Sequence, residues 1–231
     1  MNQFVDAIQF IFNEHESPAG GAQVGGLSNM WDLMSEHLQL SVAAMAIACA
    51  LSIPLGLWLG HIGKGGFLAI NVSNVGRAVP SLALIAFFVA YLGVGFTNVT
   101  LALVLLAIPP ILTNTYVGVR QVDRDVIDAG RGMGLRPRQV VQRIELPLAL
   151  PSIFGGIRTS AVNVVATATI APLAGVLTLG DYILSANVYG EAGRLAGAIL
   201  VALLAVAVEV FFAALQRLSV PRGLALQHPA S

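Results

Sequence analysis

Charge is scarce in this chain of 231 residues, of which only 10% are charged while 56% are hydrophobic. Soluble domains carry about 25% charged residues, so this composition excludes an ordinary soluble domain. A mean hydropathy of +0.80 indicates a polytopic membrane protein. A single cysteine, Cys49, excludes a disulfide framework and a cluster of thiolate metal ligands. Residues 1–36 contain no Lys or Arg, so the basic region of a cleavable signal is missing and we expect the first span to direct insertion.

Motifs for nucleotide binding and catalysis are missing as well. The nearest fragment to a phosphate-binding loop, residues 63–65, lacks the upstream glycine and the hydroxyl that would hold magnesium. The histidines at 15, 37, 61 and 228 are scattered over predicted ends and loops, where we expect surface or interfacial side chains. We therefore expect no catalytic residue, no metal and no cofactor bound by this chain, and no nucleic-acid partner.

The apolar runs that are present have the length of membrane spans. A bilayer core needs about 20 apolar residues in a helix, and uncharged runs predict spans at 38–60, 99–119, 159–179 and 195–216. A fifth span is predicted from Gly66 to Leu92, kinked at Pro80, because 80–92 is too short alone. The expected fold is all-α, with about five core transmembrane helices.

The basic residues predict the orientation. Five spans place the two ends of the chain on opposite sides, and Arg194 falls on one side while the other basic residues fall on the other. By the positive-inside rule, the N-terminus is outside and residues 120–151 and the C-terminus are cytoplasmic. The residues on the cytoplasmic side are Lys64, Arg77, Arg120, Arg124, Arg131, Arg136, Arg138, Arg143, Arg158, Arg217 and Arg222.

Three segments follow from this arrangement. Residues 1–36 carry Phe4, Ile8 and Ile11 at helical spacing, which predicts an extracytoplasmic amphipathic helix at the interface, then a glycine-rich linker at 20–26; a loosely ordered tail is the alternative. Residues 37–218 form the transmembrane domain, and 219–231 a cytoplasmic tail. Glycine pairs at 56/60 and 193/197 predict close helix packing, within the chain or in a dimer.

The most specific pattern lies in the basic segment 120–151. Helix formers from 122 to 133 are followed by Gly134, where a left-handed cap is needed, and Pro137 can open a second helix. The segment therefore predicts a helix, a tight turn and a helix. We expect Val126, Ile127 and Ala129 to give the first helix an apolar face, with Val140, Val141 and Ile144 doing so in the second. Small residues at 129, 130 and 132 would let another surface approach closely.

This spacing resembles the EAA loop of the permeases of bacterial ABC importers, with Asp128 and Gly130 replacing the pattern's first Glu and second Ala. Further runs, such as 77–84 (RAVPSLAL) and 108–116 (IPPILTNTY), resemble the permeases of osmoprotectant importers, and the resemblance covers about 37–218. It implies a type I importer permease that docks its ATPase through this loop. The implied docking residues are Asp128, Ala129, Gly130, Gly134, Ile144, Leu146 and Pro147.

The resemblance also implies the partners and the cargo. It implies two cytoplasmic ATPase subunits, which hold ATP and Mg, a second permease subunit that is identical or a paralogue, and an extracytoplasmic solute-binding protein. The chain would lie in the bacterial cytoplasmic (inner) membrane and carry glycine betaine, carnitine, choline or proline betaine. A bulky residue at Gly134 is expected to clash in the turn and in the ATPase groove, which would abolish transport but not insertion.

Polar residues within the spans suggest a translocation path. They would suit a neutral or zwitterionic solute, or else form hydrogen bonds between helices. Glu209, an acidic residue inside a predicted span, is a candidate coupling group or packs against an arginine. The alternatives to an osmoprotectant permease are a methionine-type amino-acid ABC permease, an ion-coupled carrier and a non-transporting membrane scaffold. The candidate lining residues are Asn74, Pro80, Ser81, Asn114, Tyr116, Asn163 and Thr167.

Overall fold

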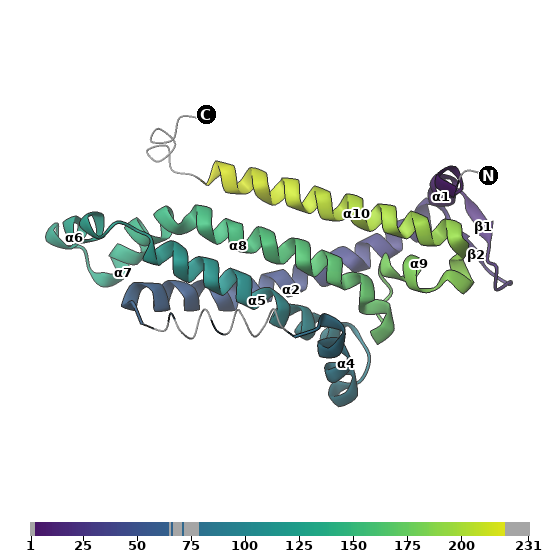
Figure 1. Cartoon of the computed structure of the whole chain (residues 1–231), viewed down its shortest axis with the longest axis horizontal. Coiled ribbons are helices and arrows are strands. Elements are labelled where there is room, and N and C mark those ends of the chain that lie inside the picture. Colours follow the sequence, from purple (N-terminus) through teal and green to yellow (C-terminus); the bar gives the residue numbers. More distant parts are fainter. Residues whose placement is uncertain (1–2, 65, 67–70, 72–78, 220–231) are drawn as a thin grey trace. The chain divides into compact units, whose positions relative to one another are not determined.

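The computed structural model describes residues 3–64, 66, 71 and 79–219, and this part of the chain is mostly helical (Figure 1). The long helices are α2 (Gly26–Ile62), α5 (Phe96–Arg120), α8 (Leu146–Thr167) and α10 (Ala186–Leu218). The shorter elements are α1 (Gln3–Phe12), β1 (Glu14–Glu16), β2 (Gln23–Gly25), α4 (Ser81–Leu92), α6 (Arg124–Gly132), α7 (Pro137–Val140), the π-helical turn η1 (Val141–Glu145), the 3₁₀ helix η2 (Ala168–Ala174) and α9 (Gly180–Leu184).

The chain divides into two compact units. Unit 1 comprises Met1–Met45, Val79–Val104 and Val162–Ala207, and unit 2 comprises Ala46–Ala78, Leu105–Ala161 and Val208–Ser231. Among the basic residues that the structure describes, only Arg194 belongs to unit 1. The segment 1–36 is part of unit 1, whereas nearly all of the expected tail at 219–231 lies outside the described residues.

Four described helices are long and apolar enough to cross a bilayer, which confirms the expected all-α membrane fold. They are Gly26–Ile62, Phe96–Arg120, Pro137–Ala174 and Ala186–Leu218. The predicted bounds of the third span, 159–179, were wrong, since the helix begins at Pro137 and ends before Gly175, whose φ of 77° stops it. The charge of Arg158, which lies inside this helix, led to a predicted start at 159.

The fifth predicted span falls largely outside the described residues in its first half. Its second half is α4 (Ser81–Leu92), and Pro80 stands before it as the N-cap, with φ −62° and ψ 127°. The predicted kink at Pro80 inside a continuous helix was therefore wrong. Proline lacks an N–H and disfavours helical geometry in the residue before it, so the helix starts afresh at Ser81.

In unit 1 the N-terminal segment is built into the core. A helix, α1, is present in the segment where an amphipathic helix was predicted, and it lies beside the start of α10 in Figure 1. Ala7 and Phe10 are buried in the core, whereas Phe4 and Ile8 are 62% and 51% exposed. The expected linker at 20–26 was wrong in part, because 23–25 form β2, antiparallel to β1, and α2 begins at Gly26.

A polar and aromatic cluster joins three elements of unit 1. The Asp181 carboxylate accepts hydrogen bonds from Ser185 Oγ and Tyr189 Oη, each at 2.8 Å. Tyr182 donates to Asn29 Oδ1, also at 2.8 Å. Burial, and then the charge of Asp181, raise the pKa of Tyr182, so this hydroxyl stays protonated and acts as a donor. The cluster fastens α9 to the starts of α2 and α10.

Unit 2 is a tightly packed helical layer. A Cβ at Gly56 or Gly60 would lie 2.7 or 2.6 Å from a side chain of α5, so α2 and α5 approach closely there. In unit 1 a Cβ at Gly197 would lie 2.6 Å from the Cβ of Tyr182. Both glycine pairs thus serve helix packing within the chain, which was one of the two predicted roles beside a dimer contact. Ser152 and Ser160 of α8 donate to the carbonyls of Asn114 and Ala107 of α5, at 2.9 Å each.

Candidate functional site

The segment predicted to dock an ATPase is a helix, a tight turn and a helix in unit 2. Asp123 is the N-cap of α6, with its Oδ1 accepting from the N–H of Asp125 at 2.9 Å. This contact satisfies one of the free donors at the start of the helix. Pro137 occupies the first turn of α7, and the N–H of Arg136 donates to Gln139 Oε1 at 2.8 Å. Helix α7 then continues through η1 into α8.

The turn itself is a left-handed cap, as the sequence predicted. Gly134 has φ +85°, a conformation that residues with a Cβ rarely adopt. Its N–H donates to the carbonyl of Arg131 at 2.9 Å, and the N–H of Leu135 donates to that of Gly130 at 3.1 Å. These two bonds form a Schellman motif, so the angle between α6 and α7 is set by the chain itself.

The helices on the two sides of this turn share a small apolar core. Val122, Ile127 and Val140 are buried, and Leu135, Ile144 and Leu148 pack against them. The predicted apolar face of the first helix was only partly right, because Val126 is 44% exposed and Ala129 is also on the surface. A Cβ at Gly130 would overlap Ile144 Cδ1, so Gly130 is small because Ile144 packs onto it.

The outer surface of this loop offers charge and open space. Asp128 is 69% exposed at its side chain and forms an ion pair with Arg131 at 3.4 Å, a contact that solvent screens strongly. Met133 is 77% exposed, and no atom lies within 4 Å of a Cβ placed at Gly132 or Gly134. Leu146 and Pro147, at the start of α8, are half-buried. The side chains available to a partner therefore lie on α6, on the turn and on the outer faces of α7 and η1, where Arg138, Gln142 and Arg143 are exposed.

Two histidines that were expected at surfaces are instead built into the protein. In unit 1, His37 is 0% exposed, and its Nε2 lies 3.0 Å from the carbonyl oxygen of Val165. In unit 2, His61 at the end of α2 contacts both carboxylate oxygens of Glu145 through Nδ1, at 2.8 and 3.0 Å. The partners of these two histidines are 128 and 84 positions away in the sequence, so the pattern of polar residues around each histidine did not indicate them.

Glu209 has an arginine partner, one of the two alternatives for it. Arg158 donates to Glu209 Oε1 through Nε at 2.7 Å and also through its second terminal nitrogen. Gln216 links to the same group, accepting from Arg158 at 3.3 Å and donating to the carbonyl of Pro151 at 2.9 Å. Arg158, which the sequence predicts on the cytoplasmic side, lies within α8. The pairing with Arg158 explains why a carboxylate occurs within α10. A role of Glu209 in ion coupling is not required.

We expect Glu209→Leu to lower the melting temperature of the detergent-extracted protein, because Arg158 then lacks its carboxylate in an apolar region. Arg158→Leu together with Glu209→Leu should restore much of the loss. The control is Glu191→Leu, which breaks the exposed Glu191–Arg194 pair at 3.5 Å and should shift the melting temperature less. An unchanged melting temperature in Glu209→Leu would contradict the assigned role of the pair.

The candidate lining residues fall in both units. Asn114 and Tyr116 lie half-buried on α5 in unit 2, and Asn114 Nδ2 donates to the carbonyl of Pro110 at 2.8 Å. In unit 1, Asn163 is exposed on α8 and Thr167 is half-buried at its end. Pro80 and Ser81 begin α4, and Asn74 lies outside the described residues. The hydrogen bond to the backbone explains the presence of a polar side chain at Asn114. That the candidate lining residues form a translocation path stays a prediction.

Long apolar helices that carry an EAA-like helix–turn–helix define a membrane permease subunit of an ABC importer. The family described as "Binding-protein-dependent transport system inner membrane component" matches residues 52–223. The chain belongs to this family. It is thus a component of the inner membrane and a transport subunit, and the family's ATP hydrolysis belongs to a partner ATPase.

Relatives match over most of the chain. The choline transport system permease protein OpuBB of Bacillus subtilis is 37% identical over 82% of this chain and 88% of that protein. The carnitine transport permease protein OpuCB of Listeria monocytogenes is 40% identical over 82% of this chain and 87% of that protein. A chain of the MetNI methionine ABC transporter, in inward-facing conformations, matches with a TM-score of 0.71 and 19% identity, covering 84% and 98% of the two chains. This last likeness confirms the fold.

Proposed function

We propose that this chain is the permease subunit of an ATP-driven importer for compatible solutes, namely glycine betaine, carnitine, choline or proline betaine. The observation that carries the proposal is the similarity to permeases named for choline and carnitine transport, at 37% and 40% identity over 82% of the chain. The methionine transporter shares the fold at 19% identity. The similarity therefore favours an osmoprotectant over an amino acid as the solute.

The segment 120–151 is the proposed site for the cytoplasmic ATPase. Its turn is fixed by Gly134, and its exposed side chains include Asp128 and Met133. A contact that transmits force must have a defined geometry in each state, and the Schellman turn and apolar core of the loop supply it. ATP and Mg would be held by the ATPase, so this chain needs no nucleotide or metal of its own.

The remaining partners follow from the same mechanism. A second permease, identical or a paralogue, would complete the path, and an extracytoplasmic binding protein would deliver the solute. Closure of the ATPases on ATP would open the permeases outward, and hydrolysis would return them inward. Concentrated positive charge in unit 2 supports a cytoplasmic location for the docking loop and an outside N-terminus.

Uptake in cells tests the choice of solute. We expect a strain without other betaine uptake systems to take up labelled glycine betaine after a salt upshift only when it carries this chain and its partners. Choline and carnitine should compete, and methionine should not. Competition by methionine alone would contradict the osmoprotectant proposal and favour an amino acid as the solute. Uptake that resists ATP depletion but not uncouplers would indicate an ion-coupled carrier.

A further inference from the structure

Glu145 is a buried carboxylate near the end of the proposed docking segment 120–151. It is only 2% exposed and ends the π-helical turn η1, in which the N–H of Leu146 donates to the carbonyl of Val141. Such i→i+5 turns are rare and occur frequently at functional sites. A buried glutamate is seldom found without a partner, so this side chain requires an explanation that packing alone does not give.

The partner comes from another spanning helix. His61 is the next-to-last residue of α2, and 84 positions separate it from Glu145. Its Nδ1 lies 3.0 Å from Oε1 and 2.8 Å from Oε2. Nδ1 faces both oxygens, and when the carboxyl group is ionised the ring donates to it, since a carboxylate only accepts hydrogen bonds. The side chains are 17% and 3% exposed, which shields the contact from solvent.

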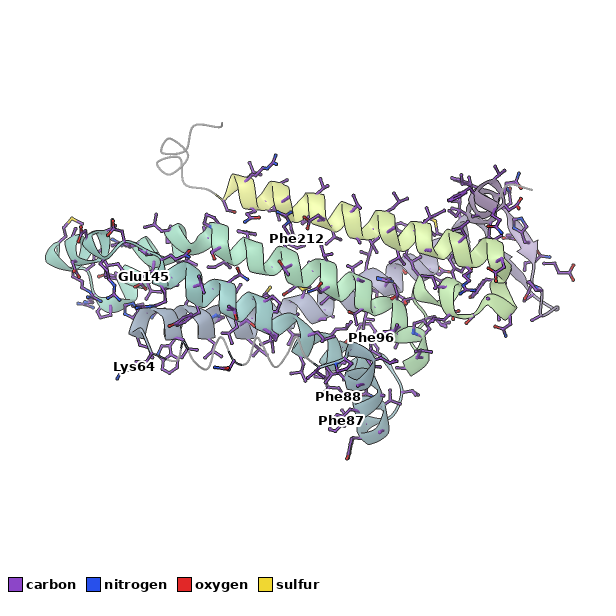
Figure 2. The ribbon with its side chains drawn as sticks, viewed as in Figure 1. Lys64, Phe87, Phe88, Phe96, Glu145 and Phe212 are labelled. Atoms are coloured by element: carbon purple, nitrogen blue, oxygen red, sulfur yellow. The ribbon has the colours of Figure 1, made fainter. Side chains whose placement is uncertain are left out.

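This contact joins elements that the apolar core of the loop leaves separate. The described residues of that core come from the loop after α5, from α6, from the turn and from the continuous helix that begins at Pro137, and none comes from α2. Helix α2 meets α8 through Ile53 and Leu57, beside Ala149 and Ile153. Figure 2 shows Glu145 near the docking helices and Lys64 just past the end of α2. The His61–Glu145 pair thus ties the end of α2 to the turn that leads into α8.

We propose that the His61–Glu145 pair couples the docking segment to the first spanning helix, so that the ATPase moves the end of α2 together with the loop. Both residues are positioning residues for transport, and the proposal rests on the proposed importer function. Without the pair, the loop could follow the ATPase while α2 lags behind. ATP hydrolysis would continue, but less of its work would reach the membrane path.

The test uses the complete complex in liposomes, with glycine betaine uptake and ATP hydrolysis measured in the same preparation. Glu145→Leu and His61→Leu should each lower the uptake per ATP hydrolysed by about tenfold, a usual size for coupling between sites. The double variant should lose no more than either single one, because the same contact is removed once. Glu145→Gln and His61→Asn keep an acceptor or a donor and should retain more uptake per ATP hydrolysed. Glu191→Leu is the matched control and should leave this ratio unchanged.

A distance measurement keeps this test independent of the solute. Cys49 is the only cysteine, so Cys49→Ala gives a background in which spin labels at Ile62 and Gln142, both exposed, report on α2 and η1. With the pair intact, we expect the label distance to stay the same without nucleotide and with trapped ATP, and in Glu145→Leu to shift or broaden with ATP.

The two readouts fail in distinguishable ways. The coupling role would be overturned if the label distance changed with ATP while the pair is intact. It would also be overturned if Glu145→Leu left both the label distance and the uptake-to-hydrolysis ratio unchanged. A constant distance in a wild-type complex that takes up no betaine would support the coupling role and reject only the proposed solute.

Discussion

Gly134→Val is expected to abolish solute uptake while the chain still inserts into the membrane. Gly134 has φ +85°, and a residue with a Cβ pays about 1–2 kcal/mol in the left-handed region, with β-branched residues the least suited. Relief of this strain would open the Schellman turn and change the angle between α6 and α7. Uptake in proteoliposomes measures the loss, and the amount of chain in isolated membranes measures insertion.

The expected clash within the turn is not seen, because among the described residues no atom beyond the two chain neighbours lies within 4 Å of a Cβ at Gly134. Backbone conformation and the approach of the ATPase are the two remaining causes, and Gly134→Asn separates them, since asparagine tolerates the left-handed region. Recovery in Gly134→Asn would assign the defect to the backbone. Gly20 is the matched control, with φ +82° and open surroundings in unit 1, and Gly20→Val should transport normally. Normal uptake by Gly134→Val would refute the role of the turn.

Gly180→Ala is expected to prevent the chain from reaching a stable fold. A Cβ at this position would overlap the backbone carbonyl of Thr169, and backbone cannot rotate away as a flexible side chain can. The cost should exceed the roughly 1–3 kcal/mol of ordinary overpacking. We expect detergent extraction to yield aggregated protein in place of a single species in size-exclusion chromatography.

Gly132→Ala is the control for this variant, because no atom lies within 4 Å of the added Cβ and alanine favours a helix. It should be extracted as well as the wild type. A monodisperse Gly180→Ala protein with a wild-type melting temperature would show that α9 and η2 can separate at little cost, and would contradict the packing described for unit 1.

The turn at Gly134 could be predicted from the sequence because its determinants are local. A glycine after a helical stretch and a proline three residues later specify a left-handed cap and a new helix, and Gly134 and Pro137 occupy these places. Four spanning helices were also predictable, since apolar length alone identifies them.

Contacts between distant segments could not be predicted in the same way. Because a span was expected to be uncharged, the third one was predicted to begin only after Arg158, yet this side chain lies inside α8, where Glu209 of α10 pairs with it. Gly130 suggested a partner's approach, but Ile144 of the same chain packs there. Composition identifies a charged or a small residue, but it does not identify the side chain or surface that contacts that residue in the fold.

Cross-linking from the docking turn tests the central claim most directly. In the Cys49→Ala background, a photoreactive maleimide is attached at Met133→Cys and activated in membranes that contain the ATPase. Met133 is 77% exposed in the wild type. The control is the same label at Trp31→Cys, because Trp31 is 64% exposed at the start of α2. We expect an adduct with the ATPase from position 133 and none from position 31. An adduct from position 31 alone would contradict both the docking assignment and the inferred orientation.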